Sequence, residues 1–249
     1  MNRENILKNV LNVFITCRIK TFPIDCFDLL DQYGYSVVTY QKVKLQSEEL
    51  YQMCHEYSDE SFRDGTHRII AYNDEKPSRR IRFSLAHELG HHVLGHTKDT
   101  KDNEMEANYF ASCLLAPCMA IHYCGLKTPR DVAQMFQLSD EASRIAFEHY
   151  QSWHRNIQHN GLRMTGLDKA FYDHFYDPMQ KRFICSVKTC DFCGQTLYNS
   201  ISNHCRCCEI PDFETSGTPA RSSRTFHDIR YDDDYAVFQR MENRWLYGE

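Results

Sequence analysis

Two histidines and a glutamate stand at a spacing that suits zinc chemistry. The segment His87-Glu88-Leu89-Gly90-His91 is an HExxH motif. On an α-helix, a four-residue step places both histidines on one face about one turn apart, where their imidazoles can bind one zinc ion. Glu88 then projects beside the metal, as a general base rather than a ligand. The alternative, two core histidines satisfied by backbone carbonyls with Glu88 in solvent, is less favoured, because polar groups on the apolar stripe of a buried helix need partners.

The third zinc ligand is expected on the following helix. Glu104 lies on the same side as an apolar stripe, where a carboxylate is costly unless it is paired or binds a metal. The alternative role for Glu104 is a helix N-terminal carboxylate stabilised by the helix dipole. Asn108, one turn further on, is placed to orient His87 or His91 through the second ring nitrogen.

His96 is the alternative third ligand. Gly95 and His96 follow His91 by four and five residues, whereas the metzincin pattern has glycine after three and histidine after six. This mismatch favours Glu104 over His96. Glu106 is expected to point away into solvent.

These residues have the chemistry of metal-assisted peptide hydrolysis. A zinc ion polarises the carbonyl and lowers the pKa of a bound water, and Glu88 takes the proton and returns it to the leaving amine. Tyr109, His122 and Tyr123 are candidates for stabilising the oxyanion, and the sequence does not distinguish among them.

A second, structural zinc site is predicted from cysteine spacing. Six of the twelve cysteines lie between 185 and 208. A closed four-thiolate site has no position left for water, so its zinc stabilises the fold rather than doing chemistry. The two CxxC pairs with the spacing of a zinc ribbon are Cys190, Cys193, Cys205 and Cys208. As alternative ligands, Cys207 could replace Cys208, and Cys185 or His204 could also bind the zinc.

The elements that carry these residues are predicted from periodicity and capping. The class is α+β, with helices packed on a small sheet. Gly95 and Pro117 are expected to end the two helices that carry the zinc site. Helices are expected over 1–20, 22–34, 82–94 and 102–116, and strands over 35–40 and 67–72.

Residues 128–153 have the outline of a helix-turn-helix. Thr128 and Ser139 are capping residues for its two helices. The second helix offers Arg144 as its base beside several acids, so DNA binding is not expected. A packing subdomain is the favoured role, and docking of a substrate's own helix-turn-helix is the alternative.

The expected organisation is one main domain and one small module. Residues 1–155 form the metallopeptidase domain, including 128–153; the helical pattern is lost over 156–180, which predicts a linker; and 181–249 hold the zinc-ribbon module and tail. The module is either a recognition platform or a clamp. The apolar segments 236–238 and 245–247 favour docking of the tail onto the core.

Four stretches of the sequence resemble the ImmA/IrrE metallopeptidases: IAYN at 70–73, RFSLAHELGH at 82–91, LGH at 94–96 and EMEANYFASCLLAP at 104–117. The resemblance implies a zincin-like fold, zinc on His87, His91 and Glu104, and endopeptidase activity. It also implies a protein partner, since the best-understood members cut or inactivate a repressor with a helix-turn-helix domain. Ser84 stands where the family usually has threonine, and Ala116 where it commonly has methionine; neither touches the chemistry.

The predicted function is therefore an intracellular zinc endopeptidase that holds two zinc ions and acts as an anti-repressor of a mobile element or stress regulon. The alternative is a non-proteolytic regulator that keeps the zinc site and binds a repressor or DNA. The net charge of −5 gives no general attraction to nucleic acid. With no apolar run of transmembrane length and no signal peptide, the protein is expected in the cytoplasm, without a membrane partner.

Overall fold

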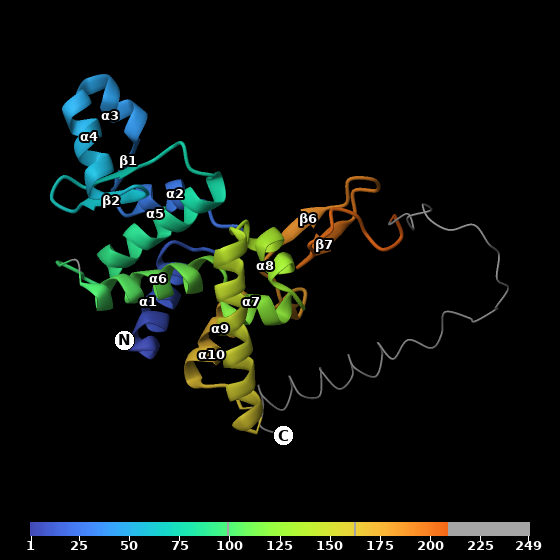
Figure 1. The fold of residues 1–249 in the computed structure, drawn as a ribbon. Helices are drawn as coiled ribbons and strands as arrows, with labels where there is room; N and C mark the ends of the chain where they lie inside the picture. The colour runs from blue at the N-terminus through green and yellow to red at the C-terminus, as the bar shows by residue number, and fades with distance from the viewer. Residues whose placement is uncertain (99, 162, 209–249) are drawn as a thin grey trace, which may run out of the picture.

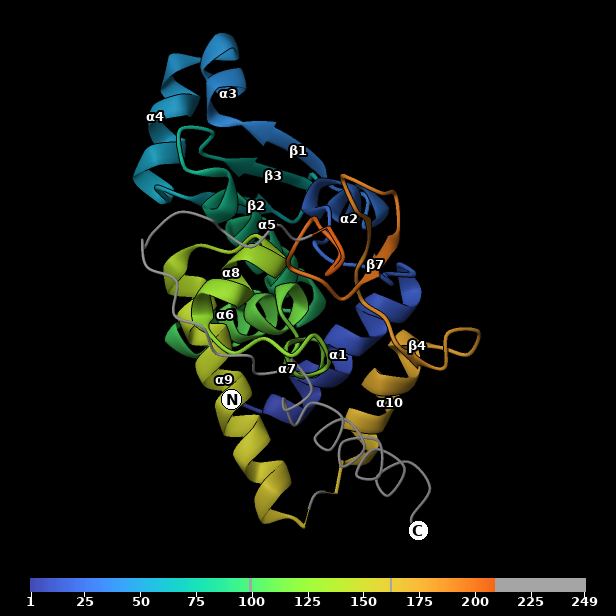
Figure 2. The same ribbon diagram turned by 90° about the vertical axis from the view of Figure 1, so that its right-hand side faces the viewer.

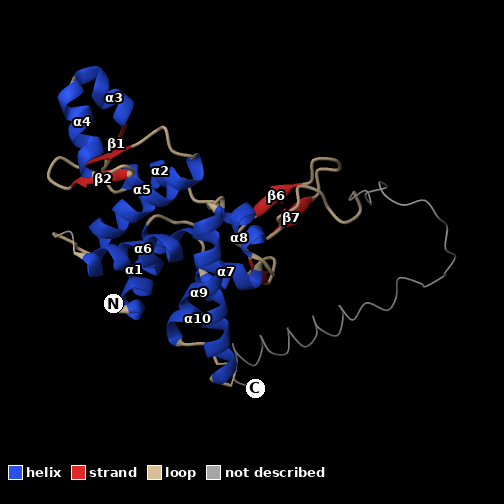
Figure 3. Ribbon diagram, in the orientation of Figure 1, coloured by secondary structure: helices blue, strands red, loops and turns tan. Residues whose placement is uncertain are grey.

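The computed structural model describes residues 1–98, 100–161 and 163–208, so the predicted docking of 236–238 and 245–247 lies outside the described residues. Helices predominate and the strands are short, which agrees with the predicted α+β class (Figure 3). In chain order the elements are α1 (Arg3–Thr16), α2 (Cys26–Gln32), β1 (Ser36–Thr39), α3 (Tyr40–Gln46), α4 (Glu48–Tyr57), β2 (Ser61–Asp64), β3 (Ile69–Tyr72), α5 (Ser78–Val93), α6 (Lys101–Leu115), α7 (Cys118–Tyr123), α8 (Pro129–Phe136), α9 (Asp140–His159), α10 (Gly166–Phe175), β4 (Tyr176–Asp177), β5 (Arg182–Phe183), β6 (Val187–Thr189) and β7 (Thr196–Tyr198).

A three-stranded sheet lies against α5 (Figure 1). The central strand β3 pairs in parallel with β1 and antiparallel with β2, so β2 forms one edge. The sequence pattern predicted β1 and β3, but β2 and the α3–α4 hairpin before it were not expected. β2 is four residues long, and Tyr40 and Cys54 are the buried residues of α3 and α4, which leaves few apolar positions to detect.

Helices α5 and α6 cross in close contact below the sheet (Figure 1). A Cβ at Gly90 would lie 3.0 Å from the ring of Phe110 and 3.2 Å from the carbonyl oxygen of Ala107, so the glycine lets the two backbones approach. α5 begins at Ser78, four residues before its predicted start, and Thr100 caps α6.

The C-terminal end of α5 is closed by a Schellman motif. Gly95 has φ +73°, in the left-handed region that favours glycine. Its amide donates to the carbonyl of His92 at 3.1 Å, and the His96 amide donates to the carbonyl of His91 at 2.9 Å. This pair of bonds turns the chain back, so that His96 returns toward the last turn of its own helix.

The predicted helix pair at 128–153 is present as α8 and α9. Thr128 and Asp131 form a reciprocal capping box at the start of α8, and Ser139 caps α9. α9 continues to His159 and packs against α6 and α7. Its N-terminal part therefore lies beside the helix that carries Glu104.

The prediction of a linker over 156–180 is wrong. α9 extends into this segment and α10 occupies most of its second half, beside α1 (Figure 2). Phe171, Tyr172 and Phe175 are buried in the same core as Phe14. The Asn, His and Gly residues before α10 indicated a loop, and the short aromatic stripe of α10 was therefore not predicted as a helix. Tertiary packing buries this stripe.

Two small hairpins follow, β4–β5 and β6–β7, and the second lies within the cysteine-rich segment. Cys185, weighed above as a zinc ligand, lies between them with its sulfur 3.1 Å from that of Cys124 on the core. It therefore contacts Cys124 at the end of α7 and does not join the cluster of Cys190, Cys193, Cys205 and Cys208. None of the described helices has the length and apolar character needed to span a membrane.

Candidate metal centre

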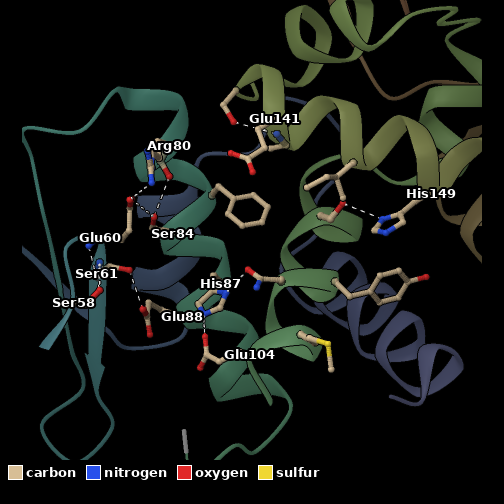
Figure 4. A pocket seen from close by; sticks show the side chains of 18 of the residues that line it. Ser58, Glu60, Ser61, Arg80, Ser84, His87, Glu88, Glu104, Glu141 and His149 are labelled. Carbon is tan, nitrogen blue, oxygen red and sulfur yellow. Dashed lines mark hydrogen bonds and ion pairs between the residues drawn. The ribbon is translucent and has the colours of Figure 1, made fainter. Parts of the chain in front are cut away.

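His87 and His91 from α5 meet Glu104 from α6, and all three line a cleft. Figure 4 shows the contact between His87 and Glu104. The two Nε2 atoms are 2.9 Å apart, and the carboxylate oxygens of Glu104 lie 3.3 Å from Nε2 of His87 and 3.2 Å from Nε2 of His91. Zinc bonds of about 2.0–2.1 Å in a tetrahedron separate neighbouring ligand atoms by about 3.3 Å. The spacing and chemistry of these donors therefore fit one zinc ion.

Glu104 reaches the histidines from the first turn of α6. Its side chain is 45% exposed, so the carboxylate faces the cleft and not the closed apolar core that the sequence suggested. Its position in the first turn also suits a negative charge near the positive end of the helix dipole. The two roles weighed for Glu104 are thus compatible.

His87 is oriented from behind by Asn108. The Asn108 side-chain oxygen lies 3.0 Å from Nδ1 of His87, which leaves Nε2 directed at the ligand cluster. Of the two histidines that Asn108 could orient, the structure places it on His87. Burial lowers the pKa of His87, partly opposed by the Glu104 carboxylate. The ring is thereby favoured in the neutral form, the form in which it binds metals.

Glu88 is buried beside the cluster and is held by a residue that sequence reasoning did not find. The Ser61 hydroxyl donates to Oε1 of Glu88 at 2.9 Å, and both side chains are buried (Figure 4). Ser61 lies at the start of the unpredicted strand β2. No local signal links two residues 27 positions apart, so only the packing of α5 on the sheet reveals this contact.

His96 lies on the far side of His91 from the ligand cluster. Its Nδ1 is 3.1 Å from Nδ1 of His91, the ring nitrogen opposite the one that faces Glu104. Its Nε2 is 3.5 Å from a carboxylate oxygen of Glu106. The expectation that Glu106 points into solvent is wrong, because its side chain is 25% exposed and pairs with His96.

A cleft of about 710 Å³ extends from the cluster between α5, α6 and the start of α9. Phe83, Met105 and Ile145 supply apolar wall, and Tyr109 also lines it. The other two oxyanion candidates lie elsewhere: His122 packs against Tyr150 and Trp153, and Tyr123 against Tyr172 and Phe183.

The second cluster brings together the four sulfurs of Cys190, Cys193, Cys205 and Cys208, with all ligand atoms within 4.8 Å of one another. Backbone amides of Cys193 and Cys205 lower the pKa of Cys190 to about 6, which favours the thiolate that a metal needs. Cys207 is exposed and is not in the cluster. His204 packs against the ring of Phe192 in a tilted arrangement and is also outside the cluster.

The family model for an IrrE N-terminal-like domain matches residues 38–157 of the chain. This region runs from β1 to the last turns of α9 and contains the whole histidine and glutamate cluster. It stops before α10 and the cysteine cluster. No curated protein matches the chain.

Proposed function

Because this chain belongs to the ImmA/IrrE family of peptidases, we propose that it is a zinc-dependent endopeptidase. His87, His91 and Glu104 would bind the catalytic zinc, and Glu88 would act as the general base. The observation that carries this proposal is the meeting of two imidazole Nε2 atoms and one carboxylate at 2.9–3.3 Å beside a buried glutamate.

Zinc bound there would supply a Lewis acid that polarises the scissile carbonyl and lowers the pKa of the attacking water. Glu88 would accept a proton from that water as the water oxygen forms the new C–O bond. It would then deliver the proton to the amide nitrogen, so that the C–N bond breaks and the amine leaves. Ser61 would hold the Glu88 carboxylate in place through its hydrogen bond. The cysteine cluster would hold a second, structural zinc, since four thiolates leave no ligand position for water.

The proposed substrate is a specific protein partner, a repressor with a helix-turn-helix domain. Support for a protein substrate comes from the cleft, which is open, runs past the cluster and has apolar wall on three helices. The choice of a repressor rests on the resemblance to the family and makes the chain an anti-repressor. Restricted docking predicts that casein stays intact at low enzyme concentration, and its rapid digestion would contradict this specificity.

A Glu88→Gln variant tests the peptidase activity. Glutamine is nearly isosteric and keeps a side-chain oxygen for Ser61, but it cannot accept the proton. The assay incubates a high concentration of the full-length, zinc-loaded protein with a peptide library, so that slow cleavage without docking can be measured, and identifies products by mass spectrometry. We expect cleavage by the wild type, with at least 100-fold less by the variant at unchanged zinc content.

The alternative function, a regulator that binds a repressor or DNA without cutting, predicts a different result. A Glu88→Gln variant would then retain zinc and also retain repressor-inactivating function in cells. Equal product yields from the wild type and the variant would exclude Glu88 as the base.

A further inference from the structure

Two residues outside the proposed zinc ligands form a chain of contacts to His91: His96 contacts His91, and Glu106 contacts His96. We propose that His96 and Glu106 position His91 for zinc, so that metal affinity depends on two residues that do not bind the metal. The inference rests on the zinc site of the proposed function but not on peptide cleavage. It also gives a role to His96 other than the third ligand considered from the sequence.

The backbone places His96 beside His91 through the end of α5. In the Schellman motif, the residue after the left-handed glycine commonly contacts the residue that accepts its amide hydrogen bond. Here that residue pair is His96 and His91, joined by the backbone bond of 2.9 Å. Arg63 further holds the turn, since its guanidinium donates to the His96 carbonyl at 3.3 Å.

The side-chain contacts then determine which nitrogen carries each proton. Nε2 of His91 faces Glu104 at 3.2 Å, so a metal bound there leaves the proton of His91 on Nδ1. That proton points at Nδ1 of His96, 3.1 Å away, which accepts it only when unprotonated. The remaining His96 proton lies on Nε2, on the side of the Glu106 carboxylate at 3.5 Å.

The two metal-binding histidines are therefore held by different partners. His87 has the side-chain amide of Asn108, whereas His91 has an imidazole backed by a carboxylate. The His96 side chain is 7% exposed, so little water is available to replace it. Ligand histidines are generally oriented by such contacts, and loss of one weakens metal binding about 10- to 100-fold.

His92 is a matched control on the same helical turn. Its Nδ1 lies 3.1 Å from the Tyr35 hydroxyl, and its ring stacks edge-on against Tyr33 and Tyr35. It is a histidine of the same helix end that faces the other side, away from the ligand cluster. Replacing it tests the effect of losing any histidine near the site.

The test measures the zinc affinity of the full-length protein by chelator competition, together with the absorption spectrum after cobalt substitution. Thiolate ligands add sulfur-to-cobalt charge-transfer bands, so the cysteine site is separated from the His87, His91 and Glu104 site. We expect His96→Ala to weaken zinc binding at the latter site by about 10- to 100-fold and to alter its cobalt spectrum. His96→Gln, whose side-chain oxygen can accept from His91, should recover part of this loss.

Glu106→Ala is the second variant, because it leaves His96 in place and spares the packing of the turn. It should weaken zinc binding less than His96→Ala, and His92→Ala should leave the affinity within about twofold of the wild type. Thermal unfolding of each zinc-free variant shows whether it is folded.

Two results would overturn this inference alone. One is wild-type affinity and cobalt spectrum in both His96→Ala and Glu106→Ala. The other is complete loss of one zinc in His96→Ala with both ions retained in a Glu104→Ala variant, which would make His96 a ligand. A wild-type protein with zinc only on its cysteines would refute this inference and the proposed function together. Tight zinc binding without peptide cleavage would refute the proposed function alone.

Discussion

Replacement of Gly90 tests how the close contact between α5 and α6 determines the geometry of the metal centre. A Cβ at this position would lie 3.0 Å from the Phe110 ring, 3.2 Å from the Ala107 carbonyl oxygen and 3.3 Å from the Ala107 Cα. Phe110 and Ala107 are both fully buried, and two of the three contacts are to backbone. A Gly90→Ala substitution therefore has to push the helices apart by a few tenths of an ångström.

The expected change in stability is the difference between two effects. Alanine in a helix interior is favoured over glycine by about 1 kcal/mol. Overpacking of a rigid core costs about 1–3 kcal/mol. A net loss of about 1 kcal/mol follows, which lowers the melting temperature by about 2–4 °C for a domain of this size. Zinc affinity should fall as well, because Ala107 is one turn from Glu104 on α6 while Gly90 adjoins His91 on α5.

Gly166→Ala is the control for glycine replacement in this protein. Nothing lies within 4 Å of a Cβ at Gly166, at the start of α10, and its φ is not positive. This variant should be stabilised by about 0.4–1 kcal/mol with unchanged zinc affinity. Thermal unfolding and chelator competition are measured on both variants and the wild type. If Gly90→Ala is stabilised to the same degree as Gly166→Ala and binds zinc equally well, the reasoning about helix contact is refuted.

Three further changes have defined outcomes. Glu104→Ala should lower the metal content from two zinc ions per chain to about one by elemental analysis, and two ions in both proteins would return His96 as the third ligand. Cys205→Ser should remove the other ion and destabilise the β6–β7 hairpin without altering His91, which histidine and cysteine resonances in NMR spectra would show. Burial lowers the pKa of His122 to about 4, so the unfolded chain, with a pKa near 6.5, binds a proton that the folded chain does not. The stability that this residue contributes above pH 6.5 is therefore lost as the pH falls toward 4, and the loss at pH 5 is at most about 2 kcal/mol. A His122→Asn variant should lose less stability between pH 7 and pH 5, as measured by urea unfolding at both values. An identical loss in both proteins would exclude His122 as its source.

Local sequence signals at helix ends predicted much of the fold. Gly95 and Pro117 marked the ends of α5 and α6, and Thr128 marked the start of α8, within a few residues, because these signals act over a single turn. They failed where burial depends on distant partners. α10 is short, and its Phe171 and Phe175 pack against Phe14 of α1 and against Phe22, more than 140 positions earlier in the chain.

The same division holds for the metal centre. A four-residue helical step by itself placed His87 and His91 on one face, and CxxC spacing by itself grouped the four cysteines, since both are local geometry. Only the tertiary structure decided what stands behind these residues: Ser61 beside Glu88, Asn108 behind His87, and His96 behind His91. These choices depend on how α5 packs against the sheet and α6, and on how its last turn closes. Relative placement of separate elements is set by side-chain packing and not by sequence spacing.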